Sequence, residues 1–258
     1  MRHGKQDTLR DYDRVINALF KKIFKPQARE LPFTKEHLES VCRELNISIK
    51  NIPDILYTYR SRGELPSTIR SEGHWVIEGK GKGRYAFIRL SRSPYIEIPL
   101  DLEAIPIPDS TPEIILKYAS ADEQSILAKI RYNRLVDTFL GLTAYQLQGH
   151  FRTTLQAIGQ VEIDELYLGV DTDGRWYVIP IEAKGPDPRD RIGIIQISWL
   201  TTFAKQYYPR LVARPVAVKA WQDGSIFLIE FNNAINLEEI RTVNYRRYKL
   251  FHEPERRQ

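Results

Sequence analysis

The sequence predicts a two-domain protein of the α+β or α/β class, in which three helices and a β-hairpin precede a mixed β-sheet flanked by helices. Helical periodicity dominates residues 10–59, and two strand-like runs around a glycine-rich turn follow. After a proline-rich stretch, further strand-like runs alternate with helical ones. With 258 residues and 42% apolar side chains, the chain can bury a core in each domain.

The composition excludes several classes of site. The single cysteine, Cys42, rules out an intramolecular disulfide and a zinc site built from several thiolates. No apolar run approaches the roughly 20 residues that cross a bilayer, and the first residues lack the apolar core of a signal peptide. We therefore expect a cytoplasmic protein with no membrane association. The net charge of +5 and the pI near 9.1 favour an anionic partner.

The first domain is expected to contain three helices and a hairpin. The helices are predicted over residues 10–24, 34–45 and 52–59, and the hairpin strands over 75–78 and 85–89. Thr34 is a suitable N-cap for the second helix, and Pro53 is tolerated in the first turn of the third. The turn over residues 79–84, GKGKGR, carries no acidic side chain. This order of elements is the plan of a winged helix-turn-helix.

In a winged helix-turn-helix, the third helix enters the major groove of DNA, and the hairpin, or wing, contacts the backbone or the minor groove. The candidate DNA-binding residues are Lys50, Asn51, Tyr57, Tyr59, Arg60 and Arg62 at the third helix, and Lys80, Lys82 and Arg84 on the wing. The alternative is a solvated charged turn beside a winged helix that binds protein. Prolines between residues 99 and 112 indicate a domain boundary. We expect a DNA-binding domain over residues 1–105 and a second domain over 106–258.

The second domain is expected to combine helices with a mixed sheet. Helices are predicted over residues 122–140, over 145–155 and from about residue 192, and strands on both sides of the turn at 171–175, over 212–218 and over 226–229. The carboxyl-terminal segment interleaves basic and aromatic residues. That composition suits either contact with nucleic acid or a solvated tail.

Three charged residues stand at matching ends of the predicted hairpin around the turn at 171–175. Asp164 lies near the start of the first strand, and Glu182 and Lys184 end the second. The hairpin returns these ends to each other, and the strand period of two puts Glu182 and Lys184 on one face. Two carboxylates can hold Mg²⁺, and a lysine can orient an attacking water or balance transition-state charge. The alternative for an E-x-K pattern is an ordinary ion pair at a strand end.

This arrangement resembles the PD-(D/E)xK nuclease superfamily, which includes many type II restriction endonucleases and Holliday-junction resolvases. The resemblance covers roughly residues 115–235. It implies a restriction-endonuclease-like core in which Asp164 and Glu182 bind Mg²⁺, with Mn²⁺ as a substitute, and Lys184 acts in catalysis. It also implies a glutamine beside the metal in the following helix, for which Gln196 is the candidate. The sequence departs from the pattern at Ile163, where the family name specifies proline.

Further acids and bases near the motif are candidates for the site. Glu162 and Glu165 are expected to face away from Asp164, although a bulge could recruit either. An acid from the preceding helices, Glu123 or Asp137, could complete a metal site as the resemblance implies. Arg152 with Lys184 could frame a phosphate, as a DNA-binding residue of the second domain.

The residues and the resemblance together predict a Mg²⁺-dependent endonuclease that hydrolyses phosphodiester bonds in double-stranded DNA. The leading subtype is a type II restriction endonuclease, with a cognate DNA methyltransferase encoded nearby and a homodimer to supply two cuts. One alternative is a repair or recombination nuclease of the Holliday-junction-resolvase kind. Another is a catalytically inactive DNA-binding regulator.

Overall fold

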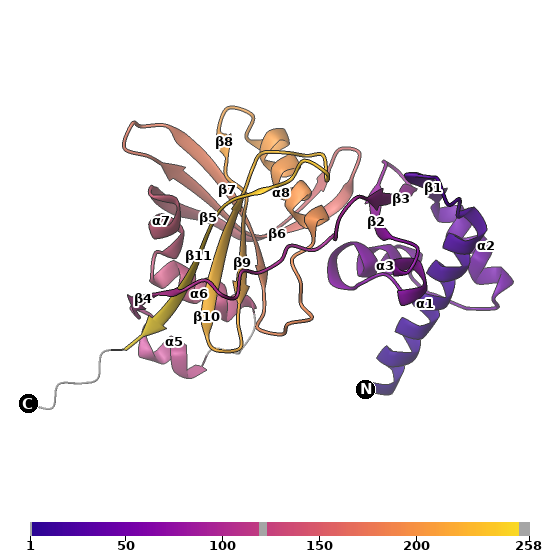
Figure 1. Cartoon of the computed structure of the whole chain (residues 1–258), viewed down its shortest axis with the longest axis horizontal. Coiled ribbons are helices and arrows are strands. Elements are labelled where there is room, and N and C mark those ends of the chain that lie inside the picture. Colours follow the sequence, from indigo (N-terminus) through magenta and orange to yellow (C-terminus); the bar gives the residue numbers. More distant parts are fainter. Residues whose placement is uncertain (1, 119–122, 253–258) are drawn as a thin grey trace, which may run out of the picture. The chain divides into compact units, whose positions relative to one another are not determined.

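The computed structural model describes residues 2–118 and 123–252, and Figure 1 shows the course of the chain. The chain forms two compact units. Unit 1 comprises Met1–Pro94 and Thr154–Gln160, and unit 2 comprises Tyr95–Thr153 and Val161–Gln258. The first boundary therefore lies at Pro94 and not at residue 105. The physical reason is that residues 95–103 already bond to unit 2. The Ile96 N–H donates to the carbonyl of Ile192, and Arg247 donates to the carbonyls of Leu100 and Leu102.

Unit 1 contains the three helices and the hairpin that the periodicity predicts. Its elements are α1 (Arg2–Ile23), β1 (Glu30–Thr34), α2 (Lys35–Glu44), α3 (Ile52–Tyr57), the π-helix η1 (Thr58–Arg62), α4 (Ser67–Arg70), β2 (His74–Gly79) and β3 (Arg84–Leu90). Thr34 is the N-cap of α2, and its backbone N–H donates to His37 Nδ1 at 3.2 Å. The sequence analysis did not predict β1 or α4. β1 pairs with β3 in a three-stranded antiparallel sheet of order β1-β3-β2.

Aromatic side chains make up much of the unit 1 core. The ring of Phe20 on α1 lies 5.3 Å from Trp75 and 5.1 Å from Phe87, both edge-on. Phe33 on β1 lies 5.0 Å from Phe87. Such ring pairs add to the burial of apolar area, so α1 and the sheet are held together through Phe87 at the centre.

Unit 2 is an eight-stranded mixed sheet with helices on its faces. Its elements are β4 (Ala104–Pro108), α5 (Glu113–Tyr118), α6 (Glu123–Tyr132), α7 (Leu135–Leu140), β5 (Thr143–Leu155), β6 (Gly159–Val170), β7 (Trp176–Lys184), α8 (Ile194–Tyr207), β8 (Val212–Ala213), β9 (Val216–Ala220), β10 (Ser225–Phe231) and β11 (Thr242–Phe251). The strand order is β4-β11-β10-β9-β7-β6-β5, and β8 also pairs with β7. β7 runs parallel to β9, and β6 and β7 form the predicted antiparallel hairpin. The α and β class predicted from the sequence is thus confirmed.

Two predicted helices of unit 2 differ in the structure. The helix expected over 122–140 is divided into α6 and α7, because Arg134 between them has a φ of 48°, which a continuous α-helix excludes. The helix expected over 145–155 is wrong, since this segment is the strand β5. Pairing with β6 supplies its backbone hydrogen bonds, and that tertiary partner overrides the local pattern. The basic carboxyl-terminal segment is also a strand, β11.

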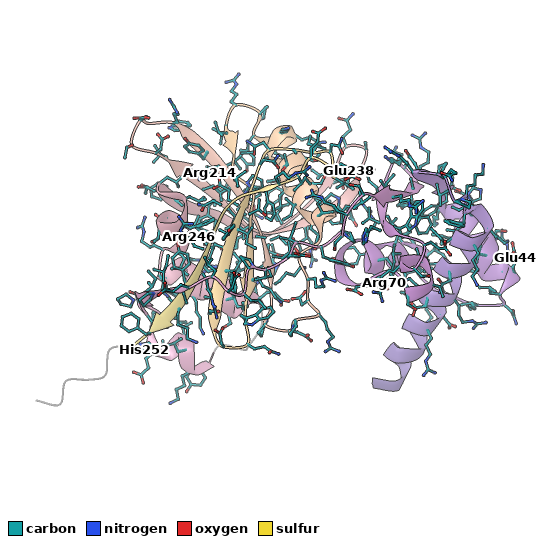
Figure 2. All side chains as sticks on the ribbon, in the orientation of Figure 1. Glu44, Arg70, Arg214, Glu238, Arg246 and His252 are labelled. Carbon is teal, nitrogen blue, oxygen red and sulfur yellow. The ribbon has the colours of Figure 1, made fainter. Side chains whose placement is uncertain are left out.

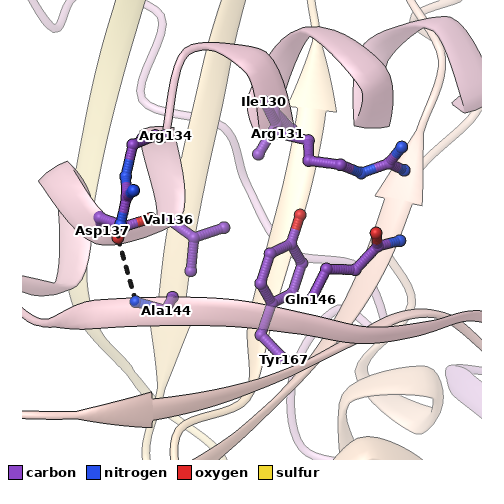
Figure 3. Close-up of a pocket in the computed structure, with 8 residues that line it drawn as sticks. All are labelled: Ile130, Arg131, Arg134, Val136, Asp137, Ala144, Gln146 and Tyr167. Carbon is purple, nitrogen blue, oxygen red and sulfur yellow. Dashed lines mark hydrogen bonds and ion pairs between the residues drawn. The ribbon is translucent and has the colours of Figure 1, made fainter.

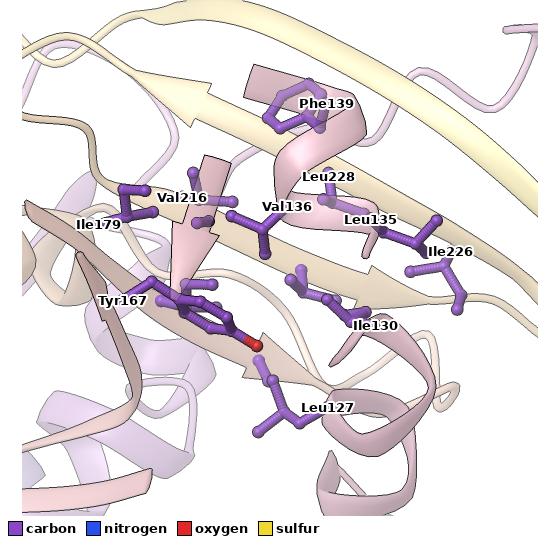
Figure 4. Close-up of a cluster of buried hydrophobic side chains, with 14 of the residues drawn as sticks. Leu127, Ile130, Leu135, Val136, Phe139, Tyr167, Ile179, Val216, Ile226 and Leu228 are labelled. Atoms are coloured by element: carbon purple, nitrogen blue, oxygen red, sulfur yellow. The ribbon is translucent and has the colours of Figure 1, made fainter. Parts of the chain in front are cut away.

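The unit 2 core lies between the sheet and the helices α6 and α7 (Figure 4). Leu127 and Ile130 of α6 and Val136 of α7 pack against Ile179 and Leu228 of the sheet. On β7 the residues with odd numbers face this core. The residues with even numbers therefore point to the opposite face, where α8 packs.

A bidentate ion pair fastens one end of the sheet. Arg214, labelled in Figure 2, lies on the unit 2 sheet. It donates to both carboxylate oxygens of Glu230, at 2.6 and 3.0 Å, and to the carbonyl of Leu140 at the end of α7 at 3.0 Å. In the described ranges, none of the helices is both long enough and apolar enough to cross a membrane.

Candidate active site

The end of β7 carries a buried pair of opposite charges. Lys184 Nζ donates to Glu182 Oε1 at 2.8 Å, and the two side chains are only 10% and 8% exposed. Both project from the face of the sheet that α8 covers, while Ala183 between them faces the α6/α7 core. An ion pair on an exposed strand end contributes little. Burial of both groups at the end of a central strand needs further partners to offset the loss of hydration.

Asp164 on β6 lies beside this pair, as the hairpin predicts. The backbone N–H of Ala183 donates to Asp164 Oδ2 at 2.7 Å. Glu165 of β6 lies directly opposite Ile181 of β7. Because the strands are antiparallel, the next residues, Asp164 and Glu182, also lie opposite each other. The carboxylate of one strand thus faces the carboxylate of its neighbour.

Gln196 joins the site from the first turn of α8. Its Nε2 donates to Glu182 Oε1, and its own Oε1 accepts from the backbone N–H of Gly193 at 3.3 Å. The side chain is buried. All four residues proposed for catalysis, Asp164, Glu182, Lys184 and Gln196, therefore meet at one place although three separate elements carry them.

The site holds more negative than positive charge. Burial raises the pKa of Asp164 to about 6, against the opposing influence of the Ala183 N–H and the Lys184 ammonium. Burial, reinforced by the charge of Asp164, raises the pKa of Glu182 to about 8. Burial alone would lower the pKa of Lys184, but the Glu182 carboxylate raises it above its ordinary value. A buried carboxylate, Glu182, and a half-buried one, Asp164, lie beside one ammonium, so an added cation would stabilise both in their ionised forms.

Two residues that the sequence analysis missed shape the loop after β7. The Asp190 carboxylate accepts from the Gly185 N–H at 2.7 Å, and its other oxygen lies 3.8 Å from Lys184 Nζ. Lys219 on β9 is buried, and its ammonium donates to the carbonyls of Gly185, Asp187 and Asp190. A lysine inside the apolar run of β9 is a signal in the sequence, because a buried ammonium requires such partners.

The two upstream acids considered for the site occupy different places. Glu123 is close to the end of β7, since a methyl group added to Gly185 would meet Glu123 Oε1 at 3.7 Å and Asp190 Oδ2 at 3.5 Å. Asp137 is engaged elsewhere, because its carboxylate accepts from the backbone N–H of Ala144 at 3.0 Å. Of these two acids, Glu123 alone stands beside the candidate site.

The expectation that Glu162 and Glu165 both face away from Asp164 is wrong for Glu162. Positions 162 and 164 alternate with the buried positions 161, 163 and 165 of β6, so Glu162 shares the face of Asp164. Its charge contributes to the raised pKa of Asp164. Glu165 lies on the opposite face, 1% exposed, where Arg131 and the hydroxyl of Tyr167 donate to it.

The donor set fits Mg²⁺, which prefers oxygen ligands and is often held by one or two carboxylates with water and substrate oxygens. Asp164 and Glu182 offer such oxygens, and because burial raises the pKa of both carboxyl groups, a bound cation would favour their ionised forms. Within residues 2–118 and 123–252, no group of three or more His, Cys, Asp or Glu side chains could hold a metal ion. If Mg²⁺ binds here, Asp164 and Glu182 would hold it, and water and substrate oxygens would complete its coordination.

Most of the DNA-binding candidates of unit 1 are exposed. The exposed residues are Lys50, Asn51, Lys80, Lys82 and Arg84. Lys80 pairs with Glu78 at 2.6 Å, and Tyr57 is half-buried. Arg60 differs from the expectation, because it donates to the carbonyl of Ile158 at 3.2 Å within unit 1 and burial lowers its pKa. Tyr59 is also buried, and the side chain of Arg62 lies outside the described residues.

Arg152 is engaged by an acid rather than by the E-x-K pair. Its Nε lies 3.2 Å from Glu162 Oε2, and His150 Nδ1 contacts the other oxygen of Glu162 at 3.0 Å. Arg152 is 78% exposed. The guanidinium of Arg152, which was expected to frame a phosphate with Lys184, therefore pairs with Glu162 instead.

A cavity of about 100 Å³ lies on the other face of the hairpin (Figure 3). Arg131, Asp137, Gln146 and Tyr167 contribute to its lining, and Gln146 Nε2 donates to the buried Glu165 at 3.1 Å. Because Asp164 faces the opposite side of β6, this cavity is separate from the candidate site.

Comparison with known proteins finds no relative: no protein-family model, no curated protein and no solved structure matches this chain.

Proposed function

We propose that the chain is a Mg²⁺-dependent endonuclease, active with Mn²⁺ as well, that hydrolyses phosphodiester bonds in double-stranded DNA. The observation that carries the proposal is the buried cluster of Asp164, Glu182, Lys184 and Gln196, in which two acids share one base. A structural ion pair would not need a second carboxylate, the half-buried Asp164, at the same place, since that carboxylate adds repulsion.

Each residue has a part in the proposed reaction. Asp164 and Glu182 would hold the cation, which when bound polarises the scissile phosphate and favours ionisation of an attacking water. The Lys184 ammonium would balance the charge that develops on the phosphate in the transition state. Gln196 fixes the orientation of the Glu182 carboxylate through its hydrogen bond to Oε1. The N–H of Ala183 does the same for Asp164.

The exposed basic residues of unit 1 would bind the DNA backbone, and the net charge of +5 supports attraction to phosphate. A type II restriction endonuclease, which would have a cognate methyltransferase, is the leading subtype. A resolvase-like repair nuclease would instead prefer branched DNA. The two are distinguished by substrate, because the first cuts linear duplex at a fixed sequence.

The test is cleavage of supercoiled plasmid and of a four-way junction by the purified protein in Mg²⁺ or Mn²⁺. Lys184→Ala should reduce the cleavage rate by about 100-fold or more, the usual cost of losing one charge-stabilising group. Lys117→Ala is the matched control, since Lys117 is an exposed lysine on α5. Circular dichroism and thermal unfolding of each variant would establish that both fold.

Cleavage by the wild type and by Lys117→Ala, but not by Lys184→Ala, would support the proposal. If DNA is bound but remains intact with every substrate and both metals, the nuclease proposal fails and a DNA-binding regulator takes its place. Equal cleavage by Lys184→Ala would place the chemistry elsewhere.

A further inference from the structure

The two edges of the unit 2 sheet are built differently. One edge is β4, whose five residues include Pro106 and Pro108. Proline has no N–H to donate, so prolines protect an edge from pairing with another strand. The other edge is β5, which has 13 residues. Its first seven, from Thr143 to Gly149, contain no proline and no charged residue, so this part of the edge lacks the usual protection.

A short window of β5 has its outer edge open. At its beginning, the N–H of Ala144 donates to the side chain of Asp137 at 3.0 Å. We infer that the N–H groups of even-numbered residues point outward here, because alternate residues of an antiparallel strand direct their N–H groups to the same side. At its end, His150 has a φ of 50°, which interrupts the extended backbone. Residues 145–149 lie between these two features and are all exposed. Leu147 is the midpoint of the window.

We propose that residues 145–149 pair antiparallel with the same residues of a second copy of this chain, about a two-fold axis through Leu147. In this register Gln146 and Gln148 of the two copies exchange backbone hydrogen bonds, since these residues point outward. Ala144 keeps its bond to Asp137. A two-fold interface uses one surface patch twice, and this segment can meet itself without like charges.

The side chains suit that register. Tyr145 and Leu147 share one face of β5 and are 63% and 51% exposed, high values for large apolar groups. Across the axis, Leu147 meets Leu147 of the second copy. Tyr145 lies opposite Gly149, where the absence of a side chain leaves room for the ring, as in aromatic and glycine pairs of other sheets. Pairing would therefore cover the exposed apolar groups on this face.

The consequence for activity rests on the proposed function. A chain with one cleavage site cuts one strand per binding event, so a two-fold dimer would present two sites related by the symmetry of duplex DNA. The interface itself is independent of the chemistry. A monomer that nicks plasmid would overturn the dimer and retain the nuclease.

Cross-linking tests the register directly. Cys42 is buried, so an introduced cysteine would be the accessible thiol. Opposed residues at the axis have Cα atoms about 4.5 Å apart, within reach of a disulfide. Leu147→Cys should therefore form a disulfide-linked dimer under oxidation. Tyr145→Cys is the matched control, because the two copies of residue 145 would stand about 13 Å apart along the strands, beyond the limit of about 7 Å.

Sedimentation of the full chain over a range of micromolar concentrations is the second measurement. The measured mass of the wild type should rise with concentration towards twice the monomer mass of 30.1 kDa, because a small interface dissociates at low concentration. Leu147→Lys should remain monomeric, as two ammonium groups would meet at the axis. Ile114→Lys, at an exposed residue of α5, should dimerise like the wild type. A wild type that is monomeric at every concentration, or equal cross-linking of the two cysteine variants, would overturn the proposal.

Discussion

Lys184 and Lys219 are register partners on the parallel strands β7 and β9, yet their ammonium groups serve different acceptors. Lys184 binds the Glu182 carboxylate at 2.8 Å, and Lys219 binds three backbone carbonyls of the loop that follows β7. Each of the two ammonium groups has its own oxygen acceptors, which offset the repulsion between them. The two lysines can therefore lie on adjacent strands. In the proposed reaction Lys184 would act on the phosphate, whereas Lys219 holds the loop that carries Asp190.

Lys219→Met should destabilise unit 2 and reduce activity. The substitution keeps a long side chain but leaves the carbonyls of Gly185, Asp187 and Asp190 without their donor. Unsatisfied buried carbonyls cost about 1–3 kcal/mol each, so we expect a loss of roughly 3 kcal/mol after partial hydration. Urea unfolding would measure it. Lys249→Met is the control, since that lysine is exposed, and a Lys219→Met protein as stable as this control would contradict the assigned role.

The stability of the metal-free protein should fall as the pH rises. The pKa of Glu182 is about 8 in the folded protein, against about 4.3 in an unfolded chain. Between these values the folded state holds a proton that the unfolded state releases. The stabilisation is complete below about pH 4 and is lost as the pH rises through about 8, with a slope of up to about 1.4 kcal/mol per pH unit.

Thermal unfolding between pH 5 and pH 8 in the presence of a chelator tests this dependence. Glu182→Gln should flatten it, whereas Glu113→Gln, at an exposed position, should not. Saturating Mg²⁺ should reverse the trend, because the cation binds the ionised acids. If Mg²⁺ leaves the wild-type unfolding temperature unchanged at pH 8, the site does not bind the cation.

The wing of unit 1 should bind DNA through phosphate contacts. Lys82 and Arg84 are exposed at the β2–β3 turn. Replacing both with alanine should weaken binding to all sequences alike. It should also reduce the slope of log affinity against log salt by about two, since each lost contact contributes about 0.9. Fluorescence anisotropy over a salt series would measure both effects.

Lys22→Ala is the control for the wing, because Lys22 is on α1 and pairs with Glu44. An unchanged salt slope in the double variant would favour the alternative, in which this unit binds protein.

Gly79→Ala should destabilise unit 1 by about 3 kcal/mol through overpacking. A methyl group on Gly79 would lie 2.2 Å from the carbonyl oxygen of Ile158, and a backbone atom has little freedom to move. Gly63→Ala is a matched control, since its nearest neighbour would be at 3.5 Å, an ordinary contact. Urea unfolding compares the two. Similar stabilities would mean that residues 154–160 do not pack closely against β2.

The sequence by itself determined the features that depend on short stretches of chain. Alternation and turn residues specify the β6–β7 hairpin, and the hairpin alone brings Asp164 to Glu182 and Lys184. Helical periodicity likewise gives α1, α2 and α3. In each case the residues that interact are close in sequence or share one element, so local geometry is sufficient.

Only the tertiary structure decided the features that depend on distant partners. Residues 145–155 show a pattern that a helix could use, yet they form β5. Their neighbour β6 is itself held in the sheet by β7, which in turn pairs with the distant strand β9. Lys219 is buried only because the loop after β7, 29 to 34 residues earlier, presents its carbonyls there. Buried polar groups and strand edges form hydrogen bonds with partners that only the complete fold places beside them. Those partners arise from the packing of the whole chain, which local patterns do not specify.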